Sequence, residues 1–224
     1  MGCRSLGVIF DMDGVLADTA EQHFQSWLAV APRWGVQITR ADFRATFGRP
    51  NHEGIPILFH RPVPPDELRE IDRLKEQAFR EIVRRSLEPL PGVVELVRAL
   101  DGSGFRLAVG SSGSRENIEL ILETLGIARH FGAVVSGWDV SRGKPDPEVF
   151  LKAAARIGVE PACCVVIEDV PAGVQAARSA GMKCIAVTTT RPAYELQSAD
   201  RVVESLADVS PEAVLELIGL PWKA

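Results

Sequence analysis

The sequence has little basic charge, few aromatic residues and no long apolar run. Its 25 Lys and Arg are outnumbered by 30 Asp and Glu, giving a formal net charge of -5, and aromatic residues make up only 6% of the chain. Nucleic-acid and membrane-surface proteins need a basic face, so we expect neither partner. No apolar stretch is long enough to span a bilayer, and no leader peptide is recognisable, because the first apolar run is short and ends at two aspartates.

Cysteine is also scarce. The four cysteines, Cys3, Cys163, Cys164 and Cys184, show no paired spacing, and the last three lie in apolar, strand-like segments. This pattern favours buried thiols in a reducing compartment over disulfides or a zinc site. We therefore expect a cytoplasmic protein with reduced cysteines.

The chain is organised around residues 6–19, LGVIFDMDGVLADT, where an apolar run stops at Asp11 and Asp13. An apolar run without polar alternation is typical of a strand buried on both faces of a parallel sheet. Ligands of open α/β sheets gather beyond the carboxyl ends of the strands, where this pair would lie. Taken alone, Asp-x-Asp-Gly is equally compatible with a plain polar turn. A calcium loop is disfavoured because no closing Glu follows at EF-hand spacing.

Residues 20–86 show helical periodicity and no convincing strand. Apolar residues recur at one-face spacing at Phe24, Trp27, Leu28 and Ala31, and again at Leu68, Ile71, Leu74, Ala78 and Ile82. Between these stretches, residues 48–65 are rich in Gly, Pro and His, which indicates loops between short helices.

Strand and helix alternate after residues 88–92, EPLPG, where two prolines and a glycine end the helical pattern. The predicted strands are 105–109, 133–136, 163–167, 183–187 and 201–203, and the predicted helices are 93–100, 115–125, 147–157 and 172–180. This alternation implies right-handed crossovers and a doubly wound parallel sheet. We predict an α/β core domain of residues 1–18 and 89–224 with an inserted all-helical domain of residues 19–88.

Three polar clusters each follow a predicted strand. Residues 110–114, GSSGS, open a helix and could cradle an anion with hydroxyl and N–H groups, although any one serine there is more simply an N-cap. Lys144, between Gly and Pro, could serve a phosphate as a point charge, although a loop lysine is usually only solvated. Glu168 and Asp169 would repel each other at a buried strand end unless a cation such as Mg²⁺ intervened.

Together these segments resemble the four motifs of the haloacid dehalogenase superfamily of phosphotransferases. The matching stretches, in chain order, are DMDGVLADT, VGSSGS, GKPDPEVF and VVIEDVPAGVQAA. The helical insertion after the first motif resembles the small cap of the subgroup that contains β-phosphoglucomutase and many sugar-phosphate phosphatases, and TAEQHFQSW is close to the mutase. The resemblance implies a Rossmann-like core with a helical cap.

The resemblance also implies roles for individual core residues. Asp11 would attack phosphorus and form an aspartyl-phosphate, while Asp13 would act as general acid and then general base. Ser111 would hold a phosphoryl oxygen, with lesser help from the N–H groups of Ser112 and Gly113, and Lys144 would neutralise charge. The implied ligands of Mg²⁺ are Asp11, the backbone carbonyl of Asp13, Asp169 and Glu168.

In the cap, the resemblance is less complete. His23 and Trp27 match residues that flank the hinge and substrate cavity of mutase-like members, although core or surface packing explains them equally well. Lys75 matches a cap lysine of the mutase. The cap-loop arginine that grips the distal phosphate in the mutase aligns with Asn51, and Arg49 lies close enough to substitute.

We therefore expect a Mg²⁺-dependent phosphatase of a small phosphorylated metabolite, a sugar phosphate. The missing arginine makes a β-phosphoglucomutase-type mutase the second choice, and a non-catalytic phosphate- or metal-binding protein is a further alternative. Carbon–halogen cleavage is disfavoured because it needs no proton donor at Asp13. We expect a monomer or a weak homodimer.

Overall fold

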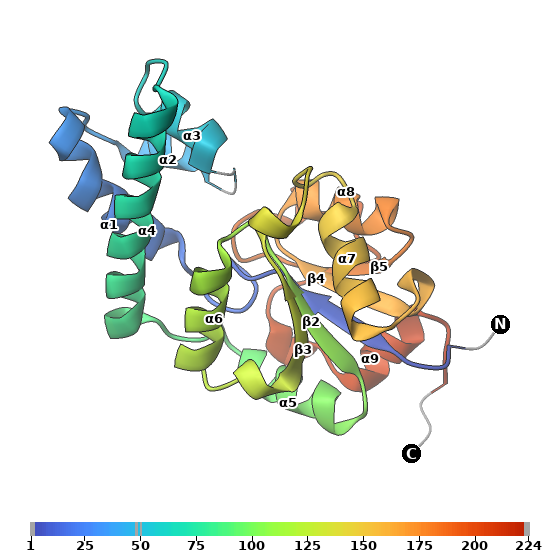
Figure 1. Cartoon of the computed structure of the whole chain (residues 1–224). Helices are drawn as coiled ribbons and strands as arrows, with labels where there is room; N and C mark the ends of the chain where they lie inside the picture. The colour runs from blue at the N-terminus through green and yellow to red at the C-terminus, as the bar shows by residue number, and fades with distance from the viewer. Residues whose placement is uncertain (1–2, 48, 50, 222–224) are drawn as a thin grey trace. The chain divides into compact units, whose positions relative to one another are not determined.

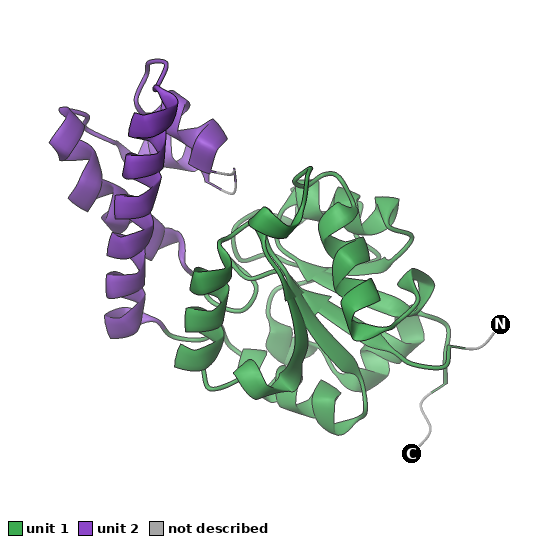
Figure 2. Cartoon of the chain, viewed as in Figure 1, with its two compact units in different colours: residues 1–18, 88–224 green, residues 19–87 purple. Residues whose placement is uncertain are grey.

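The computed structural model describes residues 3–47, 49 and 51–221. The chain forms two compact units: unit 1 comprises Met1–Asp18 and Glu88–Ala224, and unit 2 comprises Thr19–Leu87 (Figure 2). Each unit has its own apolar core.

Unit 1 is built on a six-stranded sheet in the order β3-β2-β1-β4-β5-β6, and its paired strands are all parallel (Figure 1). The strands are β1 Gly7–Phe10, β2 Arg106–Gly110, β3 Phe131–Val135, β4 Cys164–Glu168, β5 Lys183–Val187 and β6 Arg201–Val203. β1 and β4 are buried along their whole length, as the apolar runs predict. The strand order reverses direction at β1, so β1 and β4 flank the switch point where ligands of such sheets bind.

Helices cover the sheet of unit 1. They are α5 Val93–Gly102, α6 Arg115–Thr124, α7 Glu148–Ile157, α8 Pro171–Ser179 and α9 Pro211–Leu217. α7 packs on β1, β2 and β3, α8 packs on β4 and β5, and α5 contacts β2 and α9. The prediction of a doubly wound α/β fold is confirmed.

The boundaries of some elements differ from those that the sequence predicts. β3 begins at Phe131 instead of residue 133, and β4 runs from Cys164 to Glu168, one residue later than expected. Glu168 therefore closes the strand and does not follow it. α9 has no counterpart among the predicted helices, because seven residues span only two turns and give little periodicity.

Unit 2 consists of helices, and no strand occurs among its described residues. The helices are α1 Ala20–Val30, α2 Arg40–Thr46, α3 Asn51–Leu58 and α4 Pro65–Ser86, with a 3-10 turn at Ala31–Trp34. α4 is a helix as its spacing predicts, and of the residues that set this spacing Ile71 is buried and Leu68 packs partly buried against the core of unit 2. The other buried positions are Lys75, Phe79 and Val83, which that spacing does not pick out. Because Lys75 is polar, the buried face of α4 does not show as a regular apolar repeat in the sequence. Leu28, expected on the apolar face of α1, is 39% exposed.

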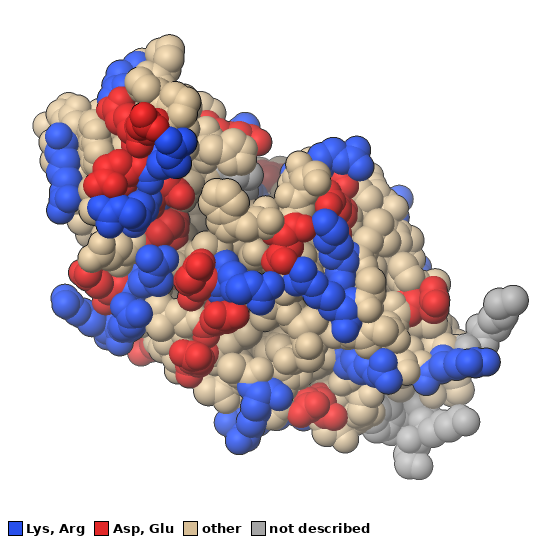
Figure 3. All heavy atoms as spheres, viewed as in Figure 1, with Lys and Arg blue, Asp and Glu red and all other residues tan. Residues whose placement is uncertain are grey.

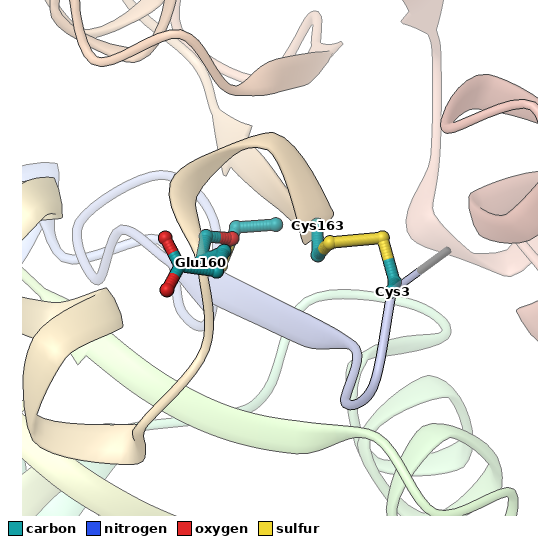
Figure 4. The surroundings of a disulfide bond; sticks show 4 residues. Cys3, Glu160 and Cys163 are labelled. Carbon is teal, nitrogen blue, oxygen red and sulfur yellow. A yellow bond between two sulfur atoms is a disulfide. The ribbon is translucent and has the colours of Figure 1, made fainter. Parts of the chain in front are cut away.

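The expectation of four reduced cysteines is also wrong, because Cys3 and Cys163 form a disulfide (Figure 4). Gly7 of β1 pairs with Cys164 of β4, so the segments that precede these two parallel strands run side by side. A separation of 160 residues hides this proximity from the sequence. Cys164 and Cys184 are free and buried, as expected, and burial raises the pKa of the Cys164 thiol to about 12.

Charged side chains of both signs are interspersed on the face of each unit that Figure 3 shows. None of the helices in the described part of the chain is both long enough and apolar enough to cross a membrane.

Candidate active site

Asp11 follows β1 directly and is held at the carboxyl edge of the sheet. Its N–H donates to the carbonyl of Ile167 at 2.9 Å, and the residue is only 7% exposed. The chain then turns sharply at Gly14, which has a φ of 78° and donates its N–H to Ala17 O at 2.9 Å. A Cβ at Gly14 would overlap the Asp169 carboxylate, so the turn requires glycine on two counts.

Lys144 lies against Asp11. Its Nζ is 2.8 Å from Asp11 Oδ1 and 2.5 Å from Glu168 Oε1, and its side chain is only 8% exposed. The ammonium also lies 4.9 Å from the centre of the Phe150 ring. Burial would lower the pKa of Lys144, but Asp11 and Glu168 outweigh it and raise the pKa above its usual range. Lys144 is therefore a fixed cation shared by two carboxylates.

Glu168 and Asp169 differ in what occupies their oxygens. Glu168 Oε1 is bonded to Lys144, and Glu168 Oε2 accepts the N–H groups of Asp169 and Val170 at 2.8 and 3.0 Å. Asp169 Oδ2 accepts the hydroxyl of Thr190, whereas Asp169 Oδ1 is buried and has no hydrogen-bond partner in the described structure. Burial, with Glu168 and Asp11 nearby, raises the pKa of Asp169 well above its usual value.

The three buried carboxylates of Asp11, Glu168 and Asp169 fit a divalent cation. Each offers one oxygen, and these oxygens all lie within 4.8 Å of one another. The pKa of Asp11 is raised to about 7, mainly by burial. The nearby Glu168 raises this pKa further, and Lys144 offsets only part of the rise. One ammonium thus does not balance three buried acids, and the unpartnered Asp169 Oδ1 points to a missing partner. A hard ion such as Mg²⁺ prefers carboxylate oxygens of this kind.

Ser111 occupies the equivalent place after β2. The residue is buried, its N–H donates to Val135 O at 3.0 Å, and its Oγ accepts the N–H of Gly113 at 3.1 Å. The N-cap of α6 is Ser114, which accepts the N–H of Asn117. Ser111 is therefore not a capping serine, and Ser112 and Gly113 lie half-buried beside it.

The structure brings most of the predicted core residues to one edge of the sheet. Asp11 and Glu168 lie in contact through Lys144, and Ser111 follows the strand next to β1. Asp13 lies half-exposed in the turn after β1, where it bridges to Ala17. Sequence reasoning missed Thr190. The available signal was a polar run, Thr188–Thr190, directly after an apolar strand.

Four of the predicted cap residues, His23, Trp27, Asn51 and Lys75, form one network within unit 2 around the buried Lys75. Lys75 is 2% exposed, and its Nζ lies 2.8 Å from His23 Nδ1 and 2.7 Å from Glu76 Oε1. The same ammonium lies 5.7 Å from the Trp27 ring and 5.2 Å from that of Phe79.

Asn51 joins this network from α3. Its Nδ2 donates to Asp72 Oδ1 at 2.6 Å and to Glu76 Oε1 at 2.7 Å. Arg49 is exposed. Its neighbours Gly48 and Pro50, part of the loop named in the sequence, lie outside the described residues.

A buried aspartate that shares a lysine with other acids can act as a nucleophile toward a group held beside a cation, which is the chemistry of a phosphotransferase or hydrolase. The family model described as "Haloacid dehalogenase-like hydrolase" matches residues 8–187. The chain belongs to this family, as its motifs predict.

Relatives and solved structures agree with this membership. A phosphorylated carbohydrates phosphatase of Thermotoga maritima is 32% identical over 213 residues, covering 94% of this chain and 97% of the relative. The chloroplastic 5-amino-6-(5-phospho-D-ribitylamino)uracil phosphatase of Arabidopsis thaliana is 34% identical over 212 residues, and the match covers 94% of this chain but 57% of that protein.

The crystal structure of β-phosphoglucomutase from Clostridium difficile superposes with a TM-score of 0.84 at 26% identity, covering 96% of this chain and 97% of that one. Family membership and these relatives support a phosphoric monoester hydrolase as the enzyme class, with phosphoglucomutase as the alternative.

Proposed function

We propose that the chain is a Mg²⁺-dependent phosphatase that hydrolyses a small phosphorylated metabolite, a sugar phosphate, through an aspartyl-phosphate. The observation that carries this proposal is the buried contact of Asp11 with Lys144, beside Glu168 and Asp169. This arrangement holds an aspartate oxygen in place and offsets part of the charge that would repel a phosphate.

In the first step, an Asp11 oxygen forms a bond to phosphorus while the ester P–O bond breaks. Asp13 gives its proton to the leaving oxygen, so the sugar departs as a neutral alcohol. Lys144 stabilises the charge shared by Asp11 and the phosphoryl group, and Ser111 holds a phosphoryl oxygen.

In the second step, Asp13, now a carboxylate, takes a proton from water. The water oxygen bonds to phosphorus, the bond to Asp11 breaks, and inorganic phosphate leaves with Asp11 regenerated. Asp11, Asp169 and the Asp13 carbonyl, with Glu168 beside them, would hold Mg²⁺, which would supply the positive charge that lets an anionic nucleophile approach a phosphate.

A phosphoglucomutase is the second candidate, favoured by the likeness to the mutase structure and by the TAEQHFQSW stretch. A mutase must hold a bisphosphate intermediate, which needs a cation for its second phosphate. Asn51, at the aligned cap position, offers a neutral amide that is already bonded to two carboxylates, Asp72 and Glu76. This acidic setting supports hydrolysis over transfer to a second sugar hydroxyl.

The test is phosphate release from a panel of sugar phosphates and other small phosphomonoesters, with and without Mg²⁺, for wild type and Asp11→Asn. We expect Mg²⁺-dependent release from a few related compounds and none from Asp11→Asn. Equal release by the two proteins would mean contamination and would remove the role of Asp11. A chain that binds phosphate without any turnover would instead be the non-catalytic binder.

β-Glucose 1-phosphate with glucose 1,6-bisphosphate separates the mutase from the phosphatase. Formation of glucose 6-phosphate with little phosphate release would establish the mutase. The cytoplasmic location and the monomeric or weakly dimeric state remain predictions. The Cys3–Cys163 disulfide removes the support that reduced cysteines gave to the first of them.

A further inference from the structure

Asp139 is a carboxylate that four donors hold at the end of the turn after β3. Its Oδ2 accepts the N–H and the hydroxyl of Ser136 at 2.8 and 2.6 Å, and an Arg115 N–H at 3.2 Å. Its Oδ1 accepts an Arg156 N–H at 2.6 Å. The hydrogen bond from Arg156 is the largest cause that holds the pKa of Asp139 well below its usual range. Asp139 is therefore a carboxylate fixed between α6 and α7.

The turn that Asp139 closes lies against residues 111–114, the segment between β2 and α6, which we call the Ser111 loop. The Gly137 N–H donates to Gly113 O at 3.0 Å, and a Cβ at Gly137 would overlap the carbonyl of Ser112. The Ser111 N–H donates to Val135 O, two residues before the turn. Arg115, the first residue of α6, follows the loop on its other side. Both ends of the Ser111 loop are thus tied to the segment of Asp139.

A second branch leads from Asp139 to the segment that carries Lys144. Lys152 Nζ donates to the Asp139 carbonyl at 2.7 Å and to Glu148 Oε1 at 2.5 Å. Glu148 Oε2 accepts the N–H groups of Ser141 and Arg142 at 2.9 and 3.1 Å. These bonds fix the backbone two residues before Lys144.

We propose that Asp139 is a positioning residue for the reaction. It holds the Ser111 loop and the segment that carries Lys144 in a fixed position relative to each other. This inference rests on the proposed phosphatase function, and Asp139 itself touches no reacting atom. Its charge matters because Arg115 and Arg156 both donate to Val134 O, at 3.1 and 2.5 Å. Without the carboxylate, two guanidinium groups would face each other and push α6 and α7 apart.

The test compares Asp139→Asn with Asp200→Asn. Asp200 is a matched control because it also pairs with a cation, Lys183 at 2.7 Å, and accepts a backbone N–H, that of Cys184 at 2.9 Å. It lies at the opposite, amino end of the sheet. We expect both variants to lower Tm by a few degrees, as lost charge-assisted bonds do.

Only Asp139→Asn should change catalysis. Since a displacement of about 1 Å can cost about 100-fold in rate, we expect kcat/KM to fall about 10- to 100-fold. The inhibition constant of inorganic phosphate should rise in parallel. Arg156→Met should lower kcat/KM as Asp139→Asn does, whereas Arg156→Lys, which keeps a cation beside Asp139, should retain most of the wild-type kcat/KM. A kcat/KM of Asp139→Asn equal to that of Asp200→Asn would reduce Asp139 to a structural residue.

Amide hydrogen exchange tests the positioning role of Asp139 without relying on phosphatase activity. If wild type releases no phosphate from any compound, the phosphatase proposal fails, but the exchange of the Ser111 and Gly137 amides still reports on the loop. Faster exchange of these amides in Asp139→Asn than in Asp200→Asn is the expected result. Equal protection in the two variants would overturn the positioning role.

Discussion

Lys144 Nζ lies 2.8 Å from Asp11 Oδ1 and 2.5 Å from Glu168 Oε1, so one ammonium connects the ends of two neighbouring strands through a third segment. Each of the three groups is nearly excluded from water. Because a buried charge without a partner is costly, the removal of any one of them changes the charge state of the others.

Lys144→Met replaces the ammonium with an apolar chain of similar length. We expect kcat to fall at least about 100-fold, because the cation that stabilises the transferring group is lost. Steady-state kinetics with saturating Mg²⁺ check this, with Lys183→Met as the control, since Lys183 is 47% exposed and remote from the site. A kcat within about twofold of wild type would contradict the role of Lys144.

Mg²⁺ should stabilise the fold through the unpartnered Asp169 Oδ1. A ligand at about 100 times its Kd adds about 2.7 kcal/mol, which corresponds to a Tm rise of about 5–10 °C in a chain of this size. Thermal melts with and without Mg²⁺ measure the shift, and a chelator should reverse it. Asp169→Asn should lose the shift, and an undiminished shift in that variant would exclude Asp169 as a ligand.

Gly173→Ala should damage the site without touching a reacting group. A Cβ at Gly173, in α8, would overlap the Glu168 carboxylate, so either Glu168 or α8 must shift, which would disturb the contact of Glu168 with Lys144. We expect lower Tm and at least about tenfold lower activity. Gly102→Ala is the matched control in α5, because an added Cβ there would meet no atom within 4 Å apart from its chain neighbours and the backbone of its own helix. Equal behaviour of the two variants would show that Glu168 tolerates displacement.

Reduction of the Cys3–Cys163 disulfide should lower stability more than activity. The bond closes a loop of well over 100 residues, for which the chain-entropy account gives about 4–5 kcal/mol and a Tm loss of about 10–20 °C. Cys3→Ser should melt like reduced wild type and be insensitive to reductant. Its kcat well below Tm should match wild type, because the bond lies at the amino end of the strands. Four titratable thiols in the unreduced, unfolded protein would contradict the bond.

Acid should remove the stability that Asp139 contributes. Because its folded pKa is held below the usual value, its ionised form stabilises the fold fully above the unfolded pKa of about 4. That stability is lost as pH falls through the lower folded value. Urea unfolding should therefore show wild type more stable than Asp139→Asn at pH 7, with the difference shrinking below pH 4. A constant difference between pH 7 and pH 2 would rule out the ionised carboxylate as its source.

The sequence predicts the core site because the strands are short apolar runs and a cluster of polar side chains lies at or just after the end of each run. In a parallel sheet, this local pattern is enough to bring Asp11, Ser111 and Glu168 to one edge. The contacts of Asp139 are less visible, because Arg115 and Arg156 come from two different helices and no local pattern relates them. Thr190 likewise follows β5, beyond the four motifs.

The buried face of α4 and the Cys3–Cys163 disulfide escape prediction for a related reason. Lys75 interrupts the apolar stripe of α4, so the periodicity points to a neighbouring face that includes Leu74 and Ala78. Its burial depends on partners from α1 and on the adjacent Glu76, which only the packed unit shows. The Cys3–Cys163 bond depends in the same way on the pairing of β1 with β4.

The position of β1 in the middle of the sheet also sets an order of events during translation. Unit 2 is continuous in sequence and can pack once Leu87 has left the ribosome, whereas β1 gains its neighbours only with Arg106–Gly110 and then Cys164–Glu168. Domains fold as units during synthesis, and distant strand pairings come late. A nascent chain thus exposes the apolar strand β1, which leads to Asp11, until β2 and β4 have been synthesised, and an unpaired apolar strand of this kind is a target for chaperones.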